Sequence, residues 1–550
     1  MRNPLSVAGA WRGGYPDGVK IALINPTPMD HYSPCIRTLS GYLRAHGHQT
    51  RMIFLPADTY GNRFKSSWRE DTWSHLMQLN DSLIADLVEL VGDADVVGVS
   101  FLTSMFDVAV QATRAIQKRY PQKRIVWGGF HPTTMPQQGL DFVDMVHVGE
   151  GEHGFLELVE RLEDGKDWSD VRNFWFRKAN GKVVGNPHRP LIQDLDSLPF
   201  QDFDFDDDWS YDQKQQHLVR LDWPTYRALM PTYPDRNGEL RPAYKTMITR
   251  GCPHKCSYCG VAFNHDLYKG QSYLRRRSVE HMVGEIKAVT LRYPEIGIIH
   301  FQDDVFFSTS TEEIQKFSTV WQREIGLPFR AQCSPTTINE EKYKALIDAG
   351  LCFTELGIQT GSTETMKMYK RGMTNEQLLK AVNIISKYKD YIQVPDYHMI
   401  LDNPWESTED VMKGLRLLWT LPPPYNLLPS SLIPYPGTEF YHKSIEDGFV
   451  TDEYNQIYRR GFHTPNGNYL NFLFFLTLFN NLPKELVQML ASDRLVRSFN
   501  QRKYDWFWGK AYQYGEYVRQ AQKLSTFAVK GKLFELKSMR DLKRVANQIK

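Results

Sequence analysis

The sequence predicts an α/β protein in which two sheets of parallel strands follow one another along the chain. Short apolar runs, such as 19–25 and 96–101, alternate with stretches in which apolar residues recur at helical spacing. The same alternation returns after Tyr244. Short, continuous apolar runs are typical of strands covered by helices on both faces. Alternating strands and helices favour parallel sheets.

The first half of the chain predicts an open, doubly wound, Rossmann-like sheet. Strand-like runs lie at 19–25, 50–55, 96–101, 124–128 and 145–148, and helical patterns at 36–46, 83–91 and 106–120 separate most of them. Ligands of such sheets bind beyond the carboxyl ends of the strands. No G-x-G-x-x-G follows the first run, so a dinucleotide is a poor candidate ligand.

Small or polar residues follow these strands, at the edge where a ligand would bind. They are Thr27, Ser100, Thr103, Gly128, Gly129, His131, Thr133, Gly149 and Glu150. Taken singly, the two adjacent glycines form a tight turn and the histidine is a hydrogen-bonded loop residue. Taken as a set, residues that expose the backbone at successive strand ends predict a flat platform for a large planar ligand.

The stretch from Thr249 to Gly260 contains the most specific motif of the chain. It places Cys252, Cys256 and Cys259 in a C-x3-C-x2-C run. Three thiolates on one loop can bind three irons of a four-iron cluster and leave the last iron without a protein ligand. A zinc site would need a further ligand, for which His265 is a candidate. Structural or redox cysteines are the third interpretation.

The strand-end residues, followed by this cysteine loop, resemble the B12-dependent radical SAM superfamily over residues 20–440. The motif D-x-H-x-x-G, found where cobalamin is bound through a histidine ligand, is missing. Its nearest counterpart, Asp396-Tyr397-His398, has Leu401 in the place of the glycine. Members similar to this chain bind cobalamin without that histidine. The resemblance implies three cofactors: a [4Fe–4S] cluster, S-adenosylmethionine and cobalamin.

The second half of the chain predicts a full or partial (β/α) barrel, whose chemistry lies at the strand C-termini. Strand-like runs lie at 245–248, 296–302, 329–333, 352–358 and 394–401. The resemblance implies that Asp303 or Asp304 binds the ammonium group of S-adenosylmethionine. It assigns Gln332, Gln359 and Ser362 to the ribose and carboxylate, and the backbone around Tyr258 to the adenine. Without the resemblance, a helix cap or a magnesium ligand is as good an interpretation of the two aspartates as a contact with S-adenosylmethionine.

We expect five segments along the chain. They are a leader (1–18), a cobalamin-binding domain (19–154), an adaptor (155–243), a radical SAM core barrel (244–440) and a helical C-terminal region (441–550). The acidic run 202–208 of the adaptor is expected to be a solvated connector. The C-terminal region is expected to be a helical cap on the barrel, with a lid for an anionic or large substrate and a nucleic-acid arm as alternatives.

Four residues outside the motifs need an interpretation. Cys333 and Cys352 are expected to be ordinary buried thiols, and Cys35 to belong to the core although it lies near a strand end. Asp402 stands where related barrels often carry glycine. It either contacts S-adenosylmethionine or substrate, or caps the helix that begins near Thr408.

Composition excludes several function classes. The chain has 550 residues and a formal net charge of +2, which gives no case for nucleic-acid binding. Six cysteines in this length form no disulfide framework and indicate a reducing cytoplasm. The N-terminus does not have the pattern of a signal peptide, and no apolar run reaches the ~20 residues that span a bilayer.

The resemblance therefore implies an anaerobic enzyme that reductively cleaves S-adenosylmethionine to a 5′-deoxyadenosyl radical. Its partners would be a small-molecule substrate and an electron donor such as flavodoxin or ferredoxin. We favour C-methylation of an unactivated carbon. The alternatives are a radical cyclisation or rearrangement, as in the anaerobic magnesium-protoporphyrin monomethyl ester cyclase, and a non-catalytic cobalamin or redox sensor.

Overall fold

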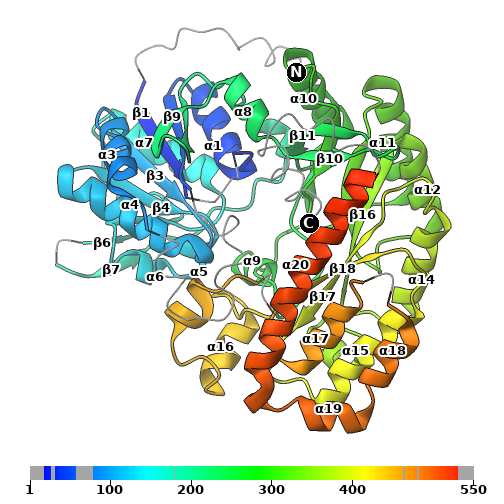
Figure 1. Ribbon diagram of the computed structural model, residues 1–550. Helices are drawn as coiled ribbons and strands as arrows, with labels where there is room; N and C mark the ends of the chain where they lie inside the picture. Colours follow the sequence, from blue (N-terminus) through cyan, green and yellow to red (C-terminus); the bar gives the residue numbers. More distant parts are fainter. Residues whose placement is uncertain are drawn as a thin grey trace.

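Two large sheets and a C-terminal group of helices form the molecule (Figure 1). The computed structural model describes residues 18–26, 31–56, 78–178, 180–462, 465–479 and 482–529. Residues 1–17 of the expected leader and Thr27, one of the expected ligand-edge residues, lie outside this part of the chain.

The first sheet has nine strands in the order β7-β6-β5-β4-β3-β1-β2-β8-β9. Six neighbouring strands run parallel: β5 (Met145–His147), β4 (Arg124–Gly128), β3 (Val96–Ser100), β1 (Lys20–Asn25), β2 (Gln49–Phe54) and β8 (Asp208–Asp212). The strands β6 (Phe174–Arg177), β7 (Val183–Gly185) and β9 (His217–Arg220) pair antiparallel at the two edges.

Helices cover both faces of this sheet, which confirms the predicted doubly wound fold. Ile21 and Leu23 of β1 pack in one core with α1 (Pro34–Ala45) and α7 (Gly151–Glu163). Ala22 and Ile24 pack in the other with α3 (Asp81–Leu90) and α4 (Phe106–Arg119). Successive strand residues point to opposite faces, so a strand covered on both sides must be apolar throughout.

The segment expected as an adaptor adds strands to the first sheet, because β6, β7, β8 and β9 all lie within it. The expectation that the acidic run 202–208 is solvated is wrong for its two ends, whereas Asp206 in its middle is exposed. Asp202 and Asp208 are buried. Asp202 accepts hydrogen bonds from Ser40 Oγ (2.6 Å) and Arg44 Nη1 (2.9 Å). Asp208 lies 3.3 Å from the fully buried guanidinium of Arg37. Two cations of α1 thus compensate the buried carboxylates.

The second sheet has seven strands in the order β10-β11-β14-β15-β16-β17-β18. Six run parallel: β11 (Leu240–Thr246), β14 (Ile298–Phe301), β15 (Phe329–Cys333), β16 (Leu351–Gln359), β17 (Asp396–Leu401) and β18 (Asn426–Ser431). The short β10 (Thr232–Pro234) pairs antiparallel at one end. The sheet keeps two ends, so the predicted barrel is a partial one.

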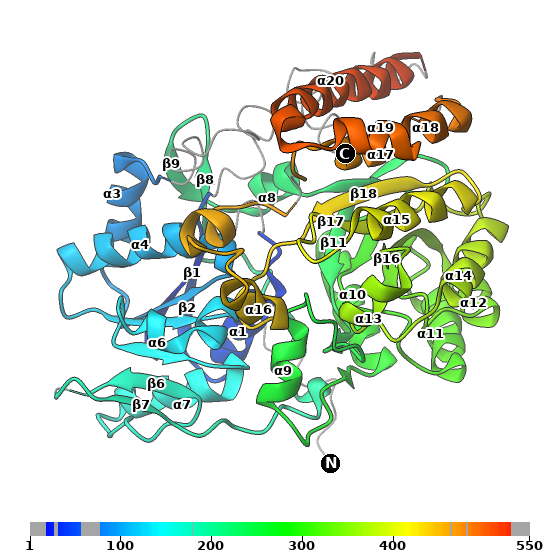
Figure 2. The same ribbon diagram turned by 90° about the horizontal axis from the view of Figure 1, so that it is seen from below.

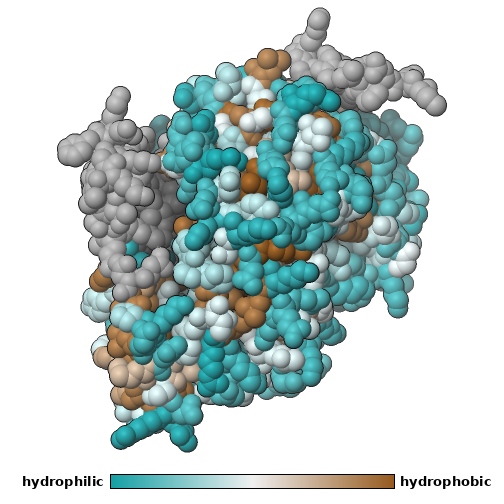
Figure 3. Space-filling model, turned by 90° about the vertical axis from the view of Figure 1, so that its right-hand side faces the viewer, coloured by the Kyte–Doolittle hydropathy of each residue, from teal (hydrophilic) through white to brown (hydrophobic). Residues whose placement is uncertain are grey.

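Helices pack on the outer face of this partial barrel (Figure 1). They are α10 (Val279–Arg292), α11 (Thr311–Glu324), α12 (Glu340–Ala349), α14 (Asn375–Lys387) and α15 (Thr408–Thr420). Their solvent side is mainly hydrophilic (Figure 3). Cys333 and Cys352 are buried, as predicted, and each thiol donates to a backbone carbonyl.

The C-terminal helices pack on the barrel and form the helical cap that the sequence predicts (Figure 2). They are α17 (Tyr469–Leu476), α18 (Lys484–Leu490), α19 (Asp493–Phe499) and α20 (Asp505–Val529). Among the described helices, none combines the length and apolarity needed to cross a bilayer.

Asp402 connects the end of β17 to this C-terminal region. Its buried carboxylate accepts hydrogen bonds from Ser431 Oγ (2.7 Å), the Asn466 backbone N–H (2.8 Å) and Asn471 Nδ2 (2.6 Å). It does not cap α15, because the side chain of Ser407 does so. The sequence left open whether Asp402 contacts a ligand or caps α15. Its carboxylate instead connects β17 to the C-terminal region.

We expect Asp402→Ala to lower the free energy of unfolding by about 3 kcal/mol, because it removes the acceptor shared by the buried side chains of Ser431 and Asn471 and by the Asn466 backbone N–H. The backbone of Asp402, with a φ of 61°, adds strain for alanine. Urea unfolding followed by tryptophan fluorescence measures the change. Glu409→Ala, which removes a surface ion pair with Arg416, is the control, and equal effects of the two substitutions would contradict the assignment.

Candidate functional site

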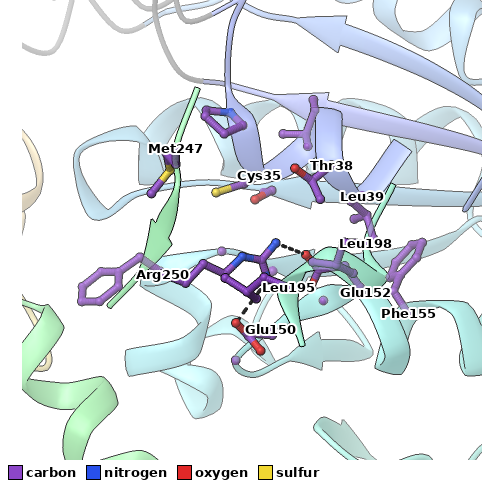
Figure 4. Close-up of a pocket in the computed structure, with 18 of the residues that line it drawn as sticks. Cys35, Thr38, Leu39, Glu150, Glu152, Phe155, Leu195, Leu198, Met247 and Arg250 are labelled. Atoms are coloured by element: carbon purple, nitrogen blue, oxygen red, sulfur yellow. Dashed lines mark hydrogen bonds and ion pairs between the residues drawn. The ribbon is translucent and has the colours of Figure 1, made fainter. Parts of the chain in front are cut away.

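A cavity of about 420 Å³ lies between the two sheets. The carboxyl edge of the first sheet lines one side, with Ser100, Gly128, Gly129, Thr133, Gly149 and Glu150. The segment 247–251, which leaves the second sheet toward the cysteine loop, lines the other. Figure 4 shows Met247 and Arg250 of this segment across the space from Cys35 and Thr38 of α1. The predicted ligand edge thus faces the cysteine-bearing domain.

Glycines keep the sheet edge open. A Cβ atom on Gly128 would have no neighbour closer than the His147 Cβ at 4.0 Å, so the space beside it belongs to the cavity. Gly129 has a φ of 91°, and a Cβ there would lie 2.7 Å from the Phe101 backbone nitrogen. The first glycine therefore provides room for a ligand, and the second provides the turn.

The inner end of the cavity is apolar. It reaches Leu23 of β1, Gly98 of β3, Val126 of β4 and Phe155 of α7. A side chain at position 98 would crowd this end, because its Cβ would lie 3.1 Å from Leu23 Cδ2. An edge of exposed backbone with an apolar recess behind it suits a planar ligand that carries an apolar appendage.

His131 and Thr103, expected at the ligand edge, lie outside the cavity lining. The His131 ring is fully buried and bonds Thr103 Oγ1 (3.1 Å) and Gln138 Oε1 (3.0 Å). Burial lowers the pKa of His131 to about 4, so the ring is neutral. Their side chains hold the turn after β4 from behind the cavity lining.

Glu150 lines the cavity but is occupied by an ion-pair network that joins the two domains. Its carboxylate lies 3.2 Å from Arg250 Nη1 and 2.9 Å from Arg275 Nη2, and it also accepts from the Ile192 backbone N–H. Glu152 is buried and pairs with the other Arg250 nitrogen (Figure 4). Neither arginine was predicted to be functional, because no local sequence motif marks either of them.

Asp303 holds the segment that leads to the cysteine loop. Its fully buried carboxylate accepts from the backbone N–H of Ile248 (3.0 Å) and from Thr249 Oγ1 (2.6 Å). It therefore points back to the exit of β11, where its oxygens are taken by the backbone and by Thr249.

Asp304 has the opposite environment. Its side chain is exposed, yet the surrounding protein and then the neighbouring Asp303 raise the pKa of its carboxyl to about 6. Its charge acts on the thiols of Cys252 and Cys259, which places it beside the cysteine loop.

The three motif cysteines have thiols close enough to interact electrostatically. Burial, with smaller contributions from the other thiols, raises the pKa of Cys252 to about 12 and that of Cys259 to about 11. The buried guanidinium of Arg371 lies 3.7 Å from the sulfur of Cys256. His265 donates its Nε2–H to the Cys252 carbonyl (2.8 Å), so this nitrogen is not free to bind zinc.

The other expected S-adenosylmethionine contacts differ in accessibility. Gln332 and Gln359 are half-buried at the ends of β15 and β16. Tyr258 is also half-buried, and its hydroxyl accepts from Arg371 Nη1 (3.2 Å). Ser362 is fully buried and its hydroxyl donates to Asp410 Oδ1 (2.6 Å). Its side chain also caps the N-terminus of α13.

The residues present fit the cofactors that the resemblance implies. Three thiols lie on one loop with a cation beside them, which suits an anionic iron–sulfur cluster that lacks one protein ligand. The cavity offers a backbone edge and an apolar recess for a planar ligand. Cys35 was expected to belong to the core, but its thiol is exposed and lines this cavity.

Two family models match the chain. The B12 binding domain matches residues 21–159, and the Radical SAM superfamily matches residues 246–415. The first range contains β2 to β5 and nearly all of β1, and the second contains β14 to β17 of the partial barrel.

Curated relatives span much of the chain. An uncharacterized methyltransferase of Pyrococcus horikoshii is 26% identical over 375 residues, which cover 67% of this chain and 74% of the relative. The anaerobic magnesium-protoporphyrin IX monomethyl ester cyclase of Rubrivivax gelatinosus is 25% identical, with 69% and 60% covered. The cytidylyl-2-hydroxyethylphosphonate methyltransferase of Streptomyces wedmorensis is 23% identical, with 80% and 85% covered.

Solved structures share the fold. The cobalamin-dependent S-adenosylmethionine radical enzyme OxsB, solved with aqua-cobalamin and S-adenosylmethionine bound, superposes with a TM-score of 0.64 at 14% identity. The match covers 100% of this chain and 88% of that one. The methyltransferase TsrM from Kitasatospora setae, solved with cobalamin and a [4Fe–4S] cluster, gives 0.57 at 16% identity, with 78% of each chain covered. At this identity the likeness concerns the fold.

The two family models, the cysteine loop and the shared cavity lead to one assignment. The chain belongs to the B12-dependent radical SAM superfamily.

Proposed function

We propose that this protein is a cobalamin-dependent radical SAM enzyme that methylates an unactivated carbon of a small-molecule substrate. The observation that supports this most directly is the single cavity shared by the open edge of the first sheet and the segment 247–251. A methyl carrier held on that edge and a radical source held by the cysteine loop would meet in one space. Two of the three curated relatives described above are named methyltransferases.

In this proposal the chain's own residues bind and orient the reactants. Cys252, Cys256 and Cys259 bind three irons, and the bound cluster supplies the electron that cleaves S-adenosylmethionine. Asp304 binds the ammonium group of S-adenosylmethionine, and Gln332 and Gln359 bind its carboxylate and ribose. The Glu150–Arg250–Arg275 network holds the cavity walls at a fixed separation.

The same proposal covers the organisation and setting of the enzyme. The segments 19–154 and 244–440 carry cobalamin and the radical chemistry, and a flavodoxin- or ferredoxin-like protein supplies electrons. A cytoplasmic location suits this chemistry, because reduced iron–sulfur clusters and free thiols persist in a reducing compartment.

The similarity to the cyclase from Rubrivivax supports cyclisation as the alternative reaction. Transfer of an isotope label distinguishes methylation from this alternative. With S-adenosylmethionine carrying a trideuterated methyl group, we expect the label to appear in the product by mass spectrometry. A product without label, formed together with 5′-deoxyadenosine, would replace methylation by cyclisation or rearrangement. No 5′-deoxyadenosine from reconstituted, reduced protein would instead favour the sensor.

We expect Cys256→Ala to abolish the cluster spectrum and the formation of 5′-deoxyadenosine while corrinoid binding persists, because the two cofactors use different residues. Iron and sulfide analysis with absorption spectra measures the first effect. Cys333→Ala, which removes a buried thiol that faces the helical core, is the matched control. Cleavage activity in Cys256→Ala would refute the cluster assignment.

We expect Gly128→Leu to abolish cobalamin binding while the cluster is retained, because the side chain would occupy space that the cavity leaves open. Gly128→Ala adds only one methyl group and should weaken binding less. Equilibrium titration with cobalamin, followed by absorption, measures both variants. Unchanged binding in Gly128→Leu would show that the cofactor lies elsewhere.

The affinity for S-adenosylmethionine should fall as the pH falls through about 6, because the Asp304 carboxyl is charged only above its pKa. A neutral carboxyl loses its attraction for the ammonium group, and about tenfold weaker binding is expected between pH 7 and pH 5. Calorimetric titration of the wild type against Asp304→Asn measures this. An equal pH dependence in the variant would remove Asp304 from the site.

A further inference from the structure

We infer that Arg371 sets the reduction potential of the iron–sulfur cluster, and that its fixed positive charge favours the reduced state. The inference rests on the proposed function, because it requires that the cysteine loop binds a cluster. No motif in the sequence marks Arg371, and it lies 112 residues after the last motif cysteine, Cys259 (371 − 259).

The turn between α13 (Thr363–Met368) and α14 is built against the cysteine loop. Ser257 Oγ donates to the Met368 carbonyl (2.5 Å), and the Ser257 backbone N–H donates to the Tyr369 carbonyl (3.2 Å). The rings of Tyr258 and Tyr369 meet edge to face with centroids 5.0 Å apart. These contacts fix the turn, and with it Arg371, relative to the cysteines.

The guanidinium of Arg371 is held in one orientation. Nη2 donates to the Gly357 carbonyl of β16 (2.7 Å), and Nη1 lies 3.2 Å from the Tyr258 hydroxyl and 3.7 Å from the Cys256 sulfur. The side chain is only 8% exposed. A cation fixed on two sides and shielded from water exerts a strong field on its neighbour.

The charge of Arg371 has no carboxylate partner within the described residues, where no ion pair includes it. Its Nε also lacks a hydrogen-bond partner there. An uncompensated buried charge is costly to the fold. A cluster held by three thiolates is anionic, and bound beside Cys256 it would supply the missing negative charge.

Reduction adds one negative charge to the cluster, so a nearby fixed cation stabilises the reduced state more than the oxidised one. Net charge and hydrogen bonds to sulfur are among the factors that set cluster potentials. Arg371 is therefore a positioning and tuning residue. It makes the electron transfer that precedes cleavage of S-adenosylmethionine more favourable for a given donor.

The test is a redox titration of reconstituted protein, followed by the electron paramagnetic resonance signal of the reduced cluster. In Arg371→Met we expect the ratio of reduced to oxidised cluster at a fixed potential to fall at least tenfold, a shift of about 59 mV for a one-electron couple. Arg371→Lys keeps the charge and should shift less. Lys370→Met removes an exposed neighbouring cation paired with Glu439 and should leave the potential unchanged.

A wild-type protein that takes up no cluster would overturn the proposed function itself. A fully loaded Arg371→Met protein with the wild-type potential would overturn only the inference about Arg371. If Arg371→Met folds but does not retain iron and sulfide, Arg371→Lys decides the matter. Retention of the cluster in Arg371→Lys supports the requirement for charge, and its loss there would show a structural role and overturn the inference.

Discussion

The ion pairs between Glu150, Glu152, Arg250 and Arg275 are the interaction on which the site depends. The first sheet and the partial barrel share one hydrophobic core, which includes Leu23 of β1 and Phe301 of β14, and the ion pairs lie beside the cavity between their two ligand edges. The carboxylates follow β5, and the arginines flank the cysteine loop on β12 (Thr249–Arg250) and β13 (Arg275–Arg276). Charge pairs shielded from solvent resist separation, because breaking them leaves uncompensated charge. These pairs tie the end of β5 to the two strands that flank the cysteine loop, on opposite sides of the cavity.

A second set of contacts positions the cysteine loop within the barrel. Asp303 accepts hydrogen bonds from Ile248 and Thr249, which precede the cysteine loop. The turn at 368–371 forms hydrogen bonds with Ser257 and Tyr258 in the middle of the loop. The cysteine loop is therefore positioned by residues from the loop after β14, from α13 and from the turn after α13. Chemistry in a superfamily that shares one cofactor reaction is tuned through such partners.

The fold could be predicted from the sequence because its signals are local. Apolar strands separated by amphipathic helices, and glycines or polar residues at strand ends, identify both sheets and their ligand edges. What the sequence does not encode locally is the direction of a side chain. Asp303 and Asp304 are neighbours, yet one points back to β11 and the other toward the cysteines. His131 and Ser362 lie at strand ends as predicted, but their polar atoms are taken by Gln138 and Asp410.

Residues missed by the sequence analysis share a different property: their partners are distant along the chain. Arg250 and Arg275 meet carboxylates about a hundred residues away, and Arg371 meets a cysteine loop of similar separation. Arginines in such positions look like surface charges in a sequence. Only the fold shows that Arg275 and Arg371 are buried, that Arg250 is half-buried, and which groups they face.

The proposed function requires cobalamin at the edge of the first sheet to lie close to a cluster on the cysteine loop, which follows the cavity-lining segment 247–251. Pulsed electron paramagnetic resonance on protein loaded with cob(II)alamin and a reduced cluster measures it directly, since both centres are paramagnetic. We expect a strong dipolar coupling between the two signals, which Gly128→Leu removes together with the corrinoid. Two fully loaded centres whose signals show no coupling would contradict it.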